Sequence, residues 1–399
     1  MNISNIFPWS DNWWFEDHKA WFIIGSRNVL CCFNLSNYEC EVMVNIPDAL
    51  SRKFRAVSKC MKYKNEIYCF PVFGNNIWIY SIEDGAFSAI PMEMPPDVCP
   101  EIYDFWEYNG EIFAVSIQLK TIFVINPREK RIENAYVLCE EGGIAKSVKV
   151  GTAIYSLSGM SEKIYKFDLV TRRIVTFELP HMGRRYSTIC FDGENFWLGG
   201  YREEVYLWNE ENNRLAIYPC NGEGSRPGGF EKHMDNGEDC ITQECEIPVF
   251  LYSAAAGKYS WFIPYQTNRI IYADKESHRL CAVEVSEEME DEESFWQEGD
   301  LKVKYVLVYV RENRYLGIFS ISQNQMLEID SEQLTYKWCD YHMGDKSIKK
   351  YAELVDCEFY ESIVWEREVY KEVLRRSSQS ACDGESEKMG DNIYRETIR

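Results

Sequence analysis

The feature that most constrains the fold of this chain is a repeat of apolar and turn-forming residues. In each unit an apolar or aromatic residue is followed eleven or twelve residues later by a second strand position, and then at once by Asn, Asp or Ser. The first positions are Trp21, Tyr68, Phe113, Tyr155, Trp197, Trp261 and Leu307. The second positions are Phe33, Tyr80, Ile125, Phe167, Trp208, Ala273 and Phe319. Since Asn, Asp and Ser close turns on their own backbone, a hairpin is predicted after each second position.

Each unit contains four predicted strands. The return strand resumes seven residues beyond the second position. A further strand precedes each unit, most clearly at 54–60, 102–108, 146–150, 187–191 and 249–253. The second positions recur at steps of 41 to 47 residues, with a single step of 65. One four-stranded sheet cannot cover both of its own faces, so units of this length indicate a β-propeller rather than the alternative, a β-sandwich. We predict an all-β, seven-bladed propeller of four-stranded blades, with six blades as the alternative.

The units resemble kelch-type propeller repeats. Residues 154–180 and 196–219 follow the kelch order of an aromatic strand, a glycine pair, a strand ending in a polar turn, and a return strand closing near Pro. Only Gly199-Gly200 keeps the glycine doublet, and Gly25 and Gly159 are single remnants. The resemblance covers about residues 12 to 330. It implies a propeller that acts as a scaffold, or one related to sugar isomerases and oxidases.

Composition limits the class of partner. Of 399 residues, 46% are hydrophobic and 15% aromatic, which excludes disorder throughout and assigns the aromatic residues to packing between blades. The balance of 43 Lys+Arg against 64 Asp+Glu leaves a net charge of −21, which argues against nucleic acid as a partner. An acidic run at 287–293 could instead dock a basic partner. No export signal or membrane-spanning run is recognised, so we expect a cytoplasmic protein with its 15 cysteines reduced.

The predicted propeller domain spans 1–330 and contains a long insertion between blades at 220–246. Cys220, His233, Cys240 and Cys245 lie in or beside this insertion, but their spacing matches none of the paired patterns of zinc sites. Glycine-rich phosphate loops and hydrolase motifs are also missing. No metal and no cofactor are therefore expected.

The remaining residues, 331–399, form a predicted amphipathic helical extension with a polar linker near 377–385. One helical stripe contains Val355, Phe359, Ile363, Tyr370, Val373 and Leu374. Either these helices pack against the propeller, or the stripe binds a partner helix or pairs two copies of the chain.

The best candidate binding site is a cluster of His181, Arg184, Arg185 and Tyr186 on one connection between blades. Two adjacent arginines in an acidic protein would attract an anion. Arg52, Arg55 and Lys146 on corresponding connections could join them at one mouth of the central channel. The alternative is that the arginines pair with nearby glutamates.

No residue pattern identifies a catalytic group, because the five histidines fall in different repeats or connections. The sequence therefore favours a non-enzymatic propeller that binds a protein partner or a small anionic or sugar ligand through one face. The alternative is an isomerase, lyase or oxidase acting on an acidic carbohydrate at the channel mouth.

Overall fold

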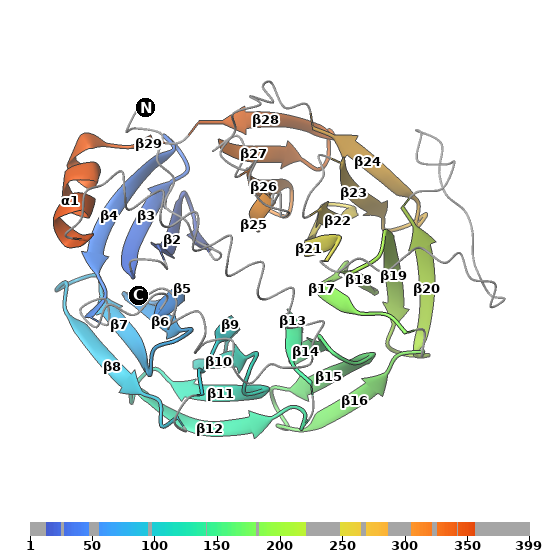
Figure 1. Cartoon of the computed structure of the whole chain (residues 1–399), viewed down its shortest axis with the longest axis horizontal. Coiled ribbons are helices and arrows are strands. Elements are labelled where there is room, and N and C mark those ends of the chain that lie inside the picture. The colour runs from blue at the N-terminus through green and yellow to red at the C-terminus, as the bar shows by residue number, and fades with distance from the viewer. Residues whose placement is uncertain are drawn as a thin grey trace, which may run out of the picture. The chain divides into compact units, whose positions relative to one another are not determined.

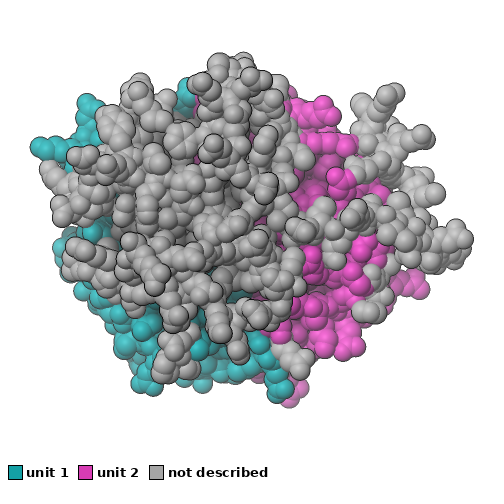
Figure 2. Space-filling view, in the orientation of Figure 1, with its two compact units in different colours: residues 1–140, 339–399 teal, residues 141–338 magenta. Residues whose placement is uncertain are grey.

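The computed structural model confirms the seven-bladed β-propeller fold (Figure 1). It describes residues 13–24, 28–47, 56–94, 98–140, 142–180, 183–220, 248–264, 269–285, 305–320, 325–340 and 342–355. The chain divides into two compact units (Figure 2). The first contains residues 1–140 and 339–399, and the second contains residues 141–338.

The first unit contains the first three blades. Their strands are β1 (Trp13–Glu16), β2 (Lys19–Ile24), β3 (Val29–Asn34), β4 (Glu39–Asn45), β5 (Val57–Tyr63), β6 (Glu66–Pro71), β7 (Asn76–Ser81), β8 (Phe87–Pro91), β9 (Ile102–Tyr108), β10 (Glu111–Ser116), β11 (Thr121–Asn126) and β12 (Arg131–Val137). Each blade is an antiparallel sheet whose strands follow chain order.

Four further sheets follow along the chain. Their strands are β13 (Ile144–Val150), β14 (Ala153–Ser158), β15 (Lys163–Asp168), β16 (Ile174–Glu178), β17 (Tyr186–Phe191), β18 (Phe196–Gly200), β19 (Glu204–Asn209), β20 (Arg214–Pro219), β21 (Phe250–Ala256), β22 (Tyr259–Pro264), β23 (Arg269–Asp274), β24 (Leu280–Glu284), β25 (Tyr305–Arg311), β26 (Tyr315–Ser320), β27 (Gln325–Asp330) and β28 (Thr335–Cys339). The strands predicted to precede the units therefore exist as β5, β9, β13, β17 and β21.

The hydrophobic core lies between consecutive blades, as the repeat predicts. Tyr155 on the second strand of blade four packs with Trp208 on the third strand of blade five. Trp197 of blade five packs in the same way with Ala273 of blade six. The second-strand position thus points toward the following blade and the third-strand position toward the preceding one, which explains the aromatic content.

The polar residue after the third strand closes the next turn with its side chain. Asp168 Oδ1 accepts hydrogen bonds from the backbone N–H groups of Val170 (3.0 Å) and Thr171 (2.6 Å). In blade two the acceptor is Asp84, bonded to the N–H of Ala86 at 3.1 Å, rather than the predicted Ser81. Equivalent bonds are made by Asn34, Asn126, Asn209, Asp274 and Asp330. In six blades the fourth residue after the acceptor has φ between 51° and 61°: Tyr38, Lys130, Arg172, Asn213, His278 and Leu334.

In the seventh blade, the two positions predicted for the second and third strands lie one strand earlier. Leu307 lies on β25, the first strand, and Phe319 on β26, the second, while Asp330 ends the third strand. The aromatic position of the second strand is taken by Gly317, where an added Cβ would overlap the ring of Tyr309 on the paired strand. The aromatic ring therefore comes from the neighbouring strand, which hides the repeat.

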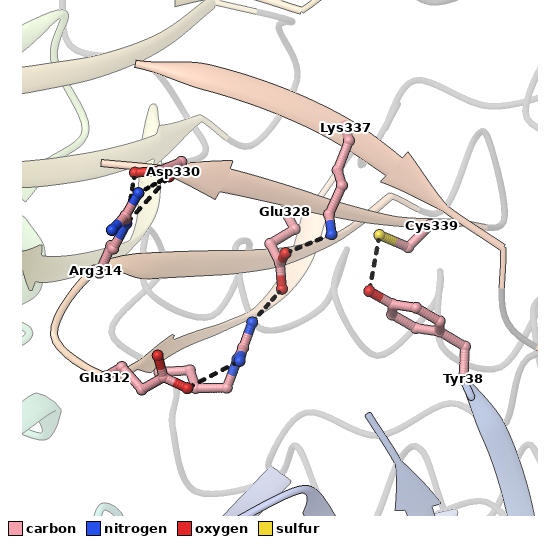
Figure 3. Close-up of polar contacts among 8 residues, drawn as sticks. Tyr38, Glu312, Arg314, Glu328, Asp330, Lys337 and Cys339 are labelled. Atoms are coloured by element: carbon pink, nitrogen blue, oxygen red, sulfur yellow. Dashed lines mark hydrogen bonds and ion pairs between the residues drawn. The ribbon is translucent and has the colours of Figure 1, made fainter. Parts of the chain in front are cut away.

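The seventh sheet continues past residue 330 to β28. Glu328 of β27 accepts ion pairs from Arg311 (3.0 Å) and Lys337 (2.9 Å), which link three strands of the sheet (Figure 3). Arg314 holds Asp330 at the end of β27 with two hydrogen bonds from Nε and one from the terminal guanidinium nitrogen.

The chain then attaches to the first blade. β29 (His342–Met343) pairs in parallel with β4, so that sheet has a fifth strand, and α1 (Asp345–Val355) packs on β4. Ser347 Oγ accepts the N–H of Val42 at 3.3 Å, and the Cys339 thiol donates to the Tyr38 hydroxyl at 3.4 Å (Figure 3). The predicted helical stripe beyond residue 355 lies outside the described residues. Among those described, no helix has the length and apolar character needed to cross a membrane.

Candidate functional site

The predicted arginine cluster lies in the second unit, where the chain enters β17. Arg184 is 7% exposed, and its Nε donates to Glu204 Oε2 at 3.1 Å, with Glu204 itself fully buried. The backbone N–H of Arg184 donates to Glu162 Oε1 at 3.0 Å. Burial alone would lower the pKa of the Arg184 guanidinium, but Tyr206 and Glu204 beside it outweigh burial and raise that pKa. The positive charge of Arg184 is thus compensated by a carboxylate of the same chain.

The other members of the cluster have separate surroundings. Arg185 is half-buried, with its guanidinium carbon 4.1 Å from the centroid of the Tyr201 ring. Tyr186 is buried, stands edge-on to Tyr206 at 5.1 Å, and has no hydrogen-bond partner for its hydroxyl among the described residues. Lys146 lies half-buried on β13.

The glycine doublet Gly199-Gly200 packs directly against the backbone of this cluster. An added Cβ at Gly200 would overlap the carbonyl oxygen of Arg185, and one at Gly199 would lie 3.1 Å from both Phe250 Cβ and Thr188 Cγ2. The bare backbone of the doublet lets β17 and β21 pack closely against β18. Gly199-Gly200 therefore has a packing role beside Arg185.

Several predicted residues lie outside the described part of the chain: His181, Arg52, Arg55, His233, Cys240 and Cys245. Cys220 is buried, and burial raises the pKa of its thiol. Within the residues that the structure describes, no group of three or more His, Cys, Asp or Glu side chains could hold a metal ion.

A cleft lies between blades four and five, and we call it the blade 4–5 cleft. Its volume is about 210 Å³. It is lined by Val150, Tyr155, Phe191, Glu194, Phe196, Asn209, Glu210 and Glu211. These residues come from β14 and from the ends and turns of β13, β17, β18 and β19, so every wall belongs to the second unit.

Glu210 anchors the polar side of the cleft. Its Oε2 accepts the Tyr155 hydroxyl at 2.5 Å, and its Oε1 accepts the Lys166 ammonium at 2.6 Å. Burial, followed by the bond to Glu210, raises the pKa of Tyr155 to about 12. Tyr155 therefore stays protonated as the donor at neutral pH. Glu210 is neutralised and held in place by two groups of blade four.

The remaining carboxylates of the cleft are not neutralised in this way. Glu194 and Glu211 are exposed, and neither forms an ion pair with a described residue. Glu194 sits on a rigid turn, because Asp192 Oδ1 accepts the N–H groups of both Glu194 and Asn195 at 2.8 Å.

The apolar walls of the cleft are aromatic. The centroid of the Phe196 ring lies 4.4 Å from that of Tyr155 and 4.8 Å from that of Phe191. Tyr155 and Phe196 are buried, whereas Phe191 is half-buried, so the Phe191 ring is the aromatic surface beside Glu194 and Glu211. An aromatic face beside carboxylates attracts an organic cation. The sequence prediction missed this site. The signals present were the pair Glu210-Glu211 directly after the Asn209 turn residue, and Val150 at the end of its strand.

Comparison with known proteins agrees with the fold. No family model and no curated protein matches the chain. Among solved structures, a streptogramin B lyase matches with a TM-score of 0.56 and 15% identity over 80% of this chain and 94% of the other. Virginiamycin B lyase from Staphylococcus aureus matches at 0.54 and 13% identity over 78% and 91%. The computationally designed Ika8 protein matches at 0.52 and 8% identity over 86% and 88%. At these identities the likeness is one of fold alone.

Proposed function

We propose that this chain is a non-enzymatic β-propeller that binds a partner carrying positive charge. The observation that supports this most directly is the contrast within the second unit. The buried cation Arg184 is paired with Glu204, whereas the carboxylates Glu194 and Glu211 beside the blade 4–5 cleft have no cation partner among the described residues. Unpaired exposed carboxylates favour a basic partner through electrostatic attraction, and the net charge of −21 adds to it.

The proposal differs from the anionic ligand expected from the sequence. An enzyme acting on an acidic carbohydrate would need cations free to hold the substrate carboxylate, and Arg184 is engaged by Glu204. The lyases with a similar fold share too little sequence for their activity to be carried over. The kelch-like resemblance of the repeats is compatible with a binding role, and we keep it as part of the proposal.

We also propose a cytoplasmic location. None of the eleven described cysteines forms a disulfide, which agrees with a reducing compartment. The thiols of Cys60 and Cys69 are buried in the first unit, and burial raises the pKa of both, so they are poor nucleophiles.

A binding measurement tests the proposed function. Fluorescence anisotropy of a labelled peptide of alternating Arg and Gly, and of a matched peptide of alternating Glu and Gly, is recorded against the full chain at low and at high salt. We expect binding of the basic peptide only, weakened by salt because exposed charges are screened. Preference for the acidic peptide, or turnover of an acidic sugar by the purified chain, would contradict the proposal.

A further inference from the structure

We infer that the blade 4–5 cleft is a receptor for the guanidinium group of an arginine side chain presented by a partner protein. This inference rests on the proposed function, since it names the chemical group through which a basic partner is recognised. It is carried by the size of the cleft, by the chemistry of its lining, and by a comparison with the blade 2–3 junction, where the turn residue Lys130 is a cation.

The size of the cleft selects a side chain over a larger ligand. Its volume is about 210 Å³. Pockets that enclose drug-sized ligands or cofactors measure roughly 300–1,000 Å³. A single long side chain entering from a partner therefore fits this cleft, whereas a drug-sized ligand or a nucleotide cofactor does not.

The lining distinguishes arginine from lysine. A guanidinium is planar and stacks on aromatic faces, and the half-buried Phe191 ring supplies one here. Its donors form a fork that pairs with carboxylates, which Glu194 and Glu211 supply. The ammonium of lysine is a compact, strongly hydrated charge that gains less from flat aromatic walls. The charge of Glu210 is already compensated by Lys166, so Glu194 and Glu211 are the carboxylates assigned to the guanidinium.

At the junction of blades two and three, the turn of the later blade carries a cation that pairs with the earlier blade. Four residues after the turn residue Asn126, Lys130 reaches back to blade two, where its ammonium lies 2.7 Å from Glu66 Oε1 and 3.2 Å from Ser88 Oγ. The residue at the same turn position in blade five is Asn213, with φ of 52° against 51° for Lys130. Asn213 also reaches back, donating to the Glu178 carbonyl at 2.8 Å, but it carries no charge.

The cleft is hollow because two large residues are replaced by small ones. At the blade 2–3 junction, Tyr63 and Glu66 face each other across the first and second strands. The paired residues at the same positions of blade four are Val150 and Ala153. Room is thus left at the blade 4–5 junction beside Glu194 and Glu211, whereas the cation of this junction, Lys166, is bound to Glu210.

The test uses three peptides and isothermal titration calorimetry with the full chain at low salt. The probe is acetyl-Gly-Arg-Gly-amide, and the controls carry citrulline, a neutral isostere of arginine, or lysine in place of arginine. We expect the arginine peptide to bind more tightly than the lysine peptide, and the citrulline peptide not to bind detectably.

Variants locate the site. Glu194→Gln combined with Glu211→Gln should weaken binding of the arginine peptide by about tenfold or more, because the Gln oxygens can accept only neutral hydrogen bonds in place of charge-assisted ones. Glu276→Gln is the matched control, since Glu276 is exposed at the turn position of blade six that corresponds to Glu211, and it should leave binding unchanged. Val150→Tyr should abolish binding by filling the cleft, and circular dichroism checks that this variant folds.

The outcomes are decisive. Equal binding of the citrulline peptide, tighter binding of the lysine peptide, no measurable binding of the arginine peptide, or unchanged affinity in the double glutamine variant each overturns the inference. If the basic Arg-Gly peptide binds the wild type and the double variant alike, the proposed function stands while the arginine receptor falls. If that peptide binds neither, both are wrong.

Discussion

The blade 2–3 and blade 4–5 junctions share a buried anchor tyrosine but end differently at the turns. Tyr68 and Tyr155 occupy the same repeat position, and each hydroxyl reaches the residue that follows the turn residue of the next blade. Tyr68 lies 3.3 Å from the carbonyl oxygen of Pro127, and Tyr155 donates to Glu210 at 2.5 Å. Four residues after the turn residue, the blade 2–3 junction has the cation Lys130 and the blade 4–5 junction has the neutral Asn213.

This difference separates the parts of the repeat that serve folding from those free to serve binding. The anchor tyrosines are both buried, at 0% and 4% exposure, because the apolar layer between blades depends on them. The turn residues lie at the surface and carry little of that packing, so they can exchange charge without loss of the blade. Changing the junctions one residue at a time should therefore separate stability from binding.

The largest expected effect is truncation of the anchor tyrosines. Tyr68→Ala should lower the free energy of unfolding by about 4 kcal/mol and Tyr155→Ala by about 3 kcal/mol, since aromatic truncation in a core costs most where the site cannot relax. Tyr155 already borders the cleft, so its removal breaks fewer contacts. Chemical denaturation measures both, with Tyr68→Phe and Tyr155→Phe as controls that keep the ring. An equal or larger cost at Tyr155 would remove the distinction between the junctions.

The next effect comes from exchanging Tyr63, which fills space at the blade 2–3 junction, and Val150, which leaves space at the blade 4–5 junction. Tyr63→Val should cost about 1–2 kcal/mol, because it removes an edge-to-face contact with Tyr68 at 6.3 Å and some buried area. Val150→Tyr enters an existing hollow, so its free energy of unfolding should stay within about 1 kcal/mol of wild type. A large loss for Val150→Tyr in denaturation experiments would mean that the cleft is not free space.

A smaller effect concerns the titration of Tyr155. Burial is the main cause that raises its pKa to about 12, and Glu210 adds to it. Because the pKa of Tyr155 is higher in the folded than in the unfolded chain, the protonated hydroxyl stabilises the fold. This stabilisation is fully present below the ordinary pKa of 10.0 and is lost as the pH rises toward 12. Glu210→Gln should lower the pKa of Tyr155 only part of the way toward 10.0. Ultraviolet absorbance titration, compared with Tyr155→Phe to identify the signal, would contradict this if the pKa became ordinary.

The sequence predicted the architecture well because the repeat depends on local rules. An aromatic residue at the second strand and an Asn or Asp at the turn are readable in one chain, and both recur in the described blades. The seventh blade was displaced because Gly317 replaces the aromatic residue and Tyr309 of the adjacent strand supplies the ring. Strand pairing of this kind leaves no sign in a linear pattern.

The candidate site was harder to predict because it depends on partners distant in sequence. Arg184 looked like an anion-binding residue until its pairing with Glu204, twenty residues later, was visible. The blade 4–5 cleft depends on the small size of Val150 and Ala153, and a residue that leaves space has no pattern of its own. Charge at the turns was visible in the sequence, but the hollow beside it was not.

The smallest expected effect lies in the turns of the blades that flank these junctions, where blade three uses Asn126 and blade four uses Asp168. The N–H of Thr171 is the first cause that holds the pKa of Asp168 below its ordinary 3.8. A lowered folded pKa means that the charge of Asp168 stabilises the fold above pH 3.8 and loses this effect as the pH falls through the folded value. Asp168→Asn keeps the acceptor oxygen and should cost less than about 1 kcal/mol at neutral pH, because the site is exposed and screened. In acid, the free energy of unfolding of Asp168→Asn should fall less steeply with decreasing pH than that of wild type. That of Asn126→Asp should fall more steeply than that of wild type. Parallel acid denaturation curves for all three proteins would show that the turn charge carries no stability.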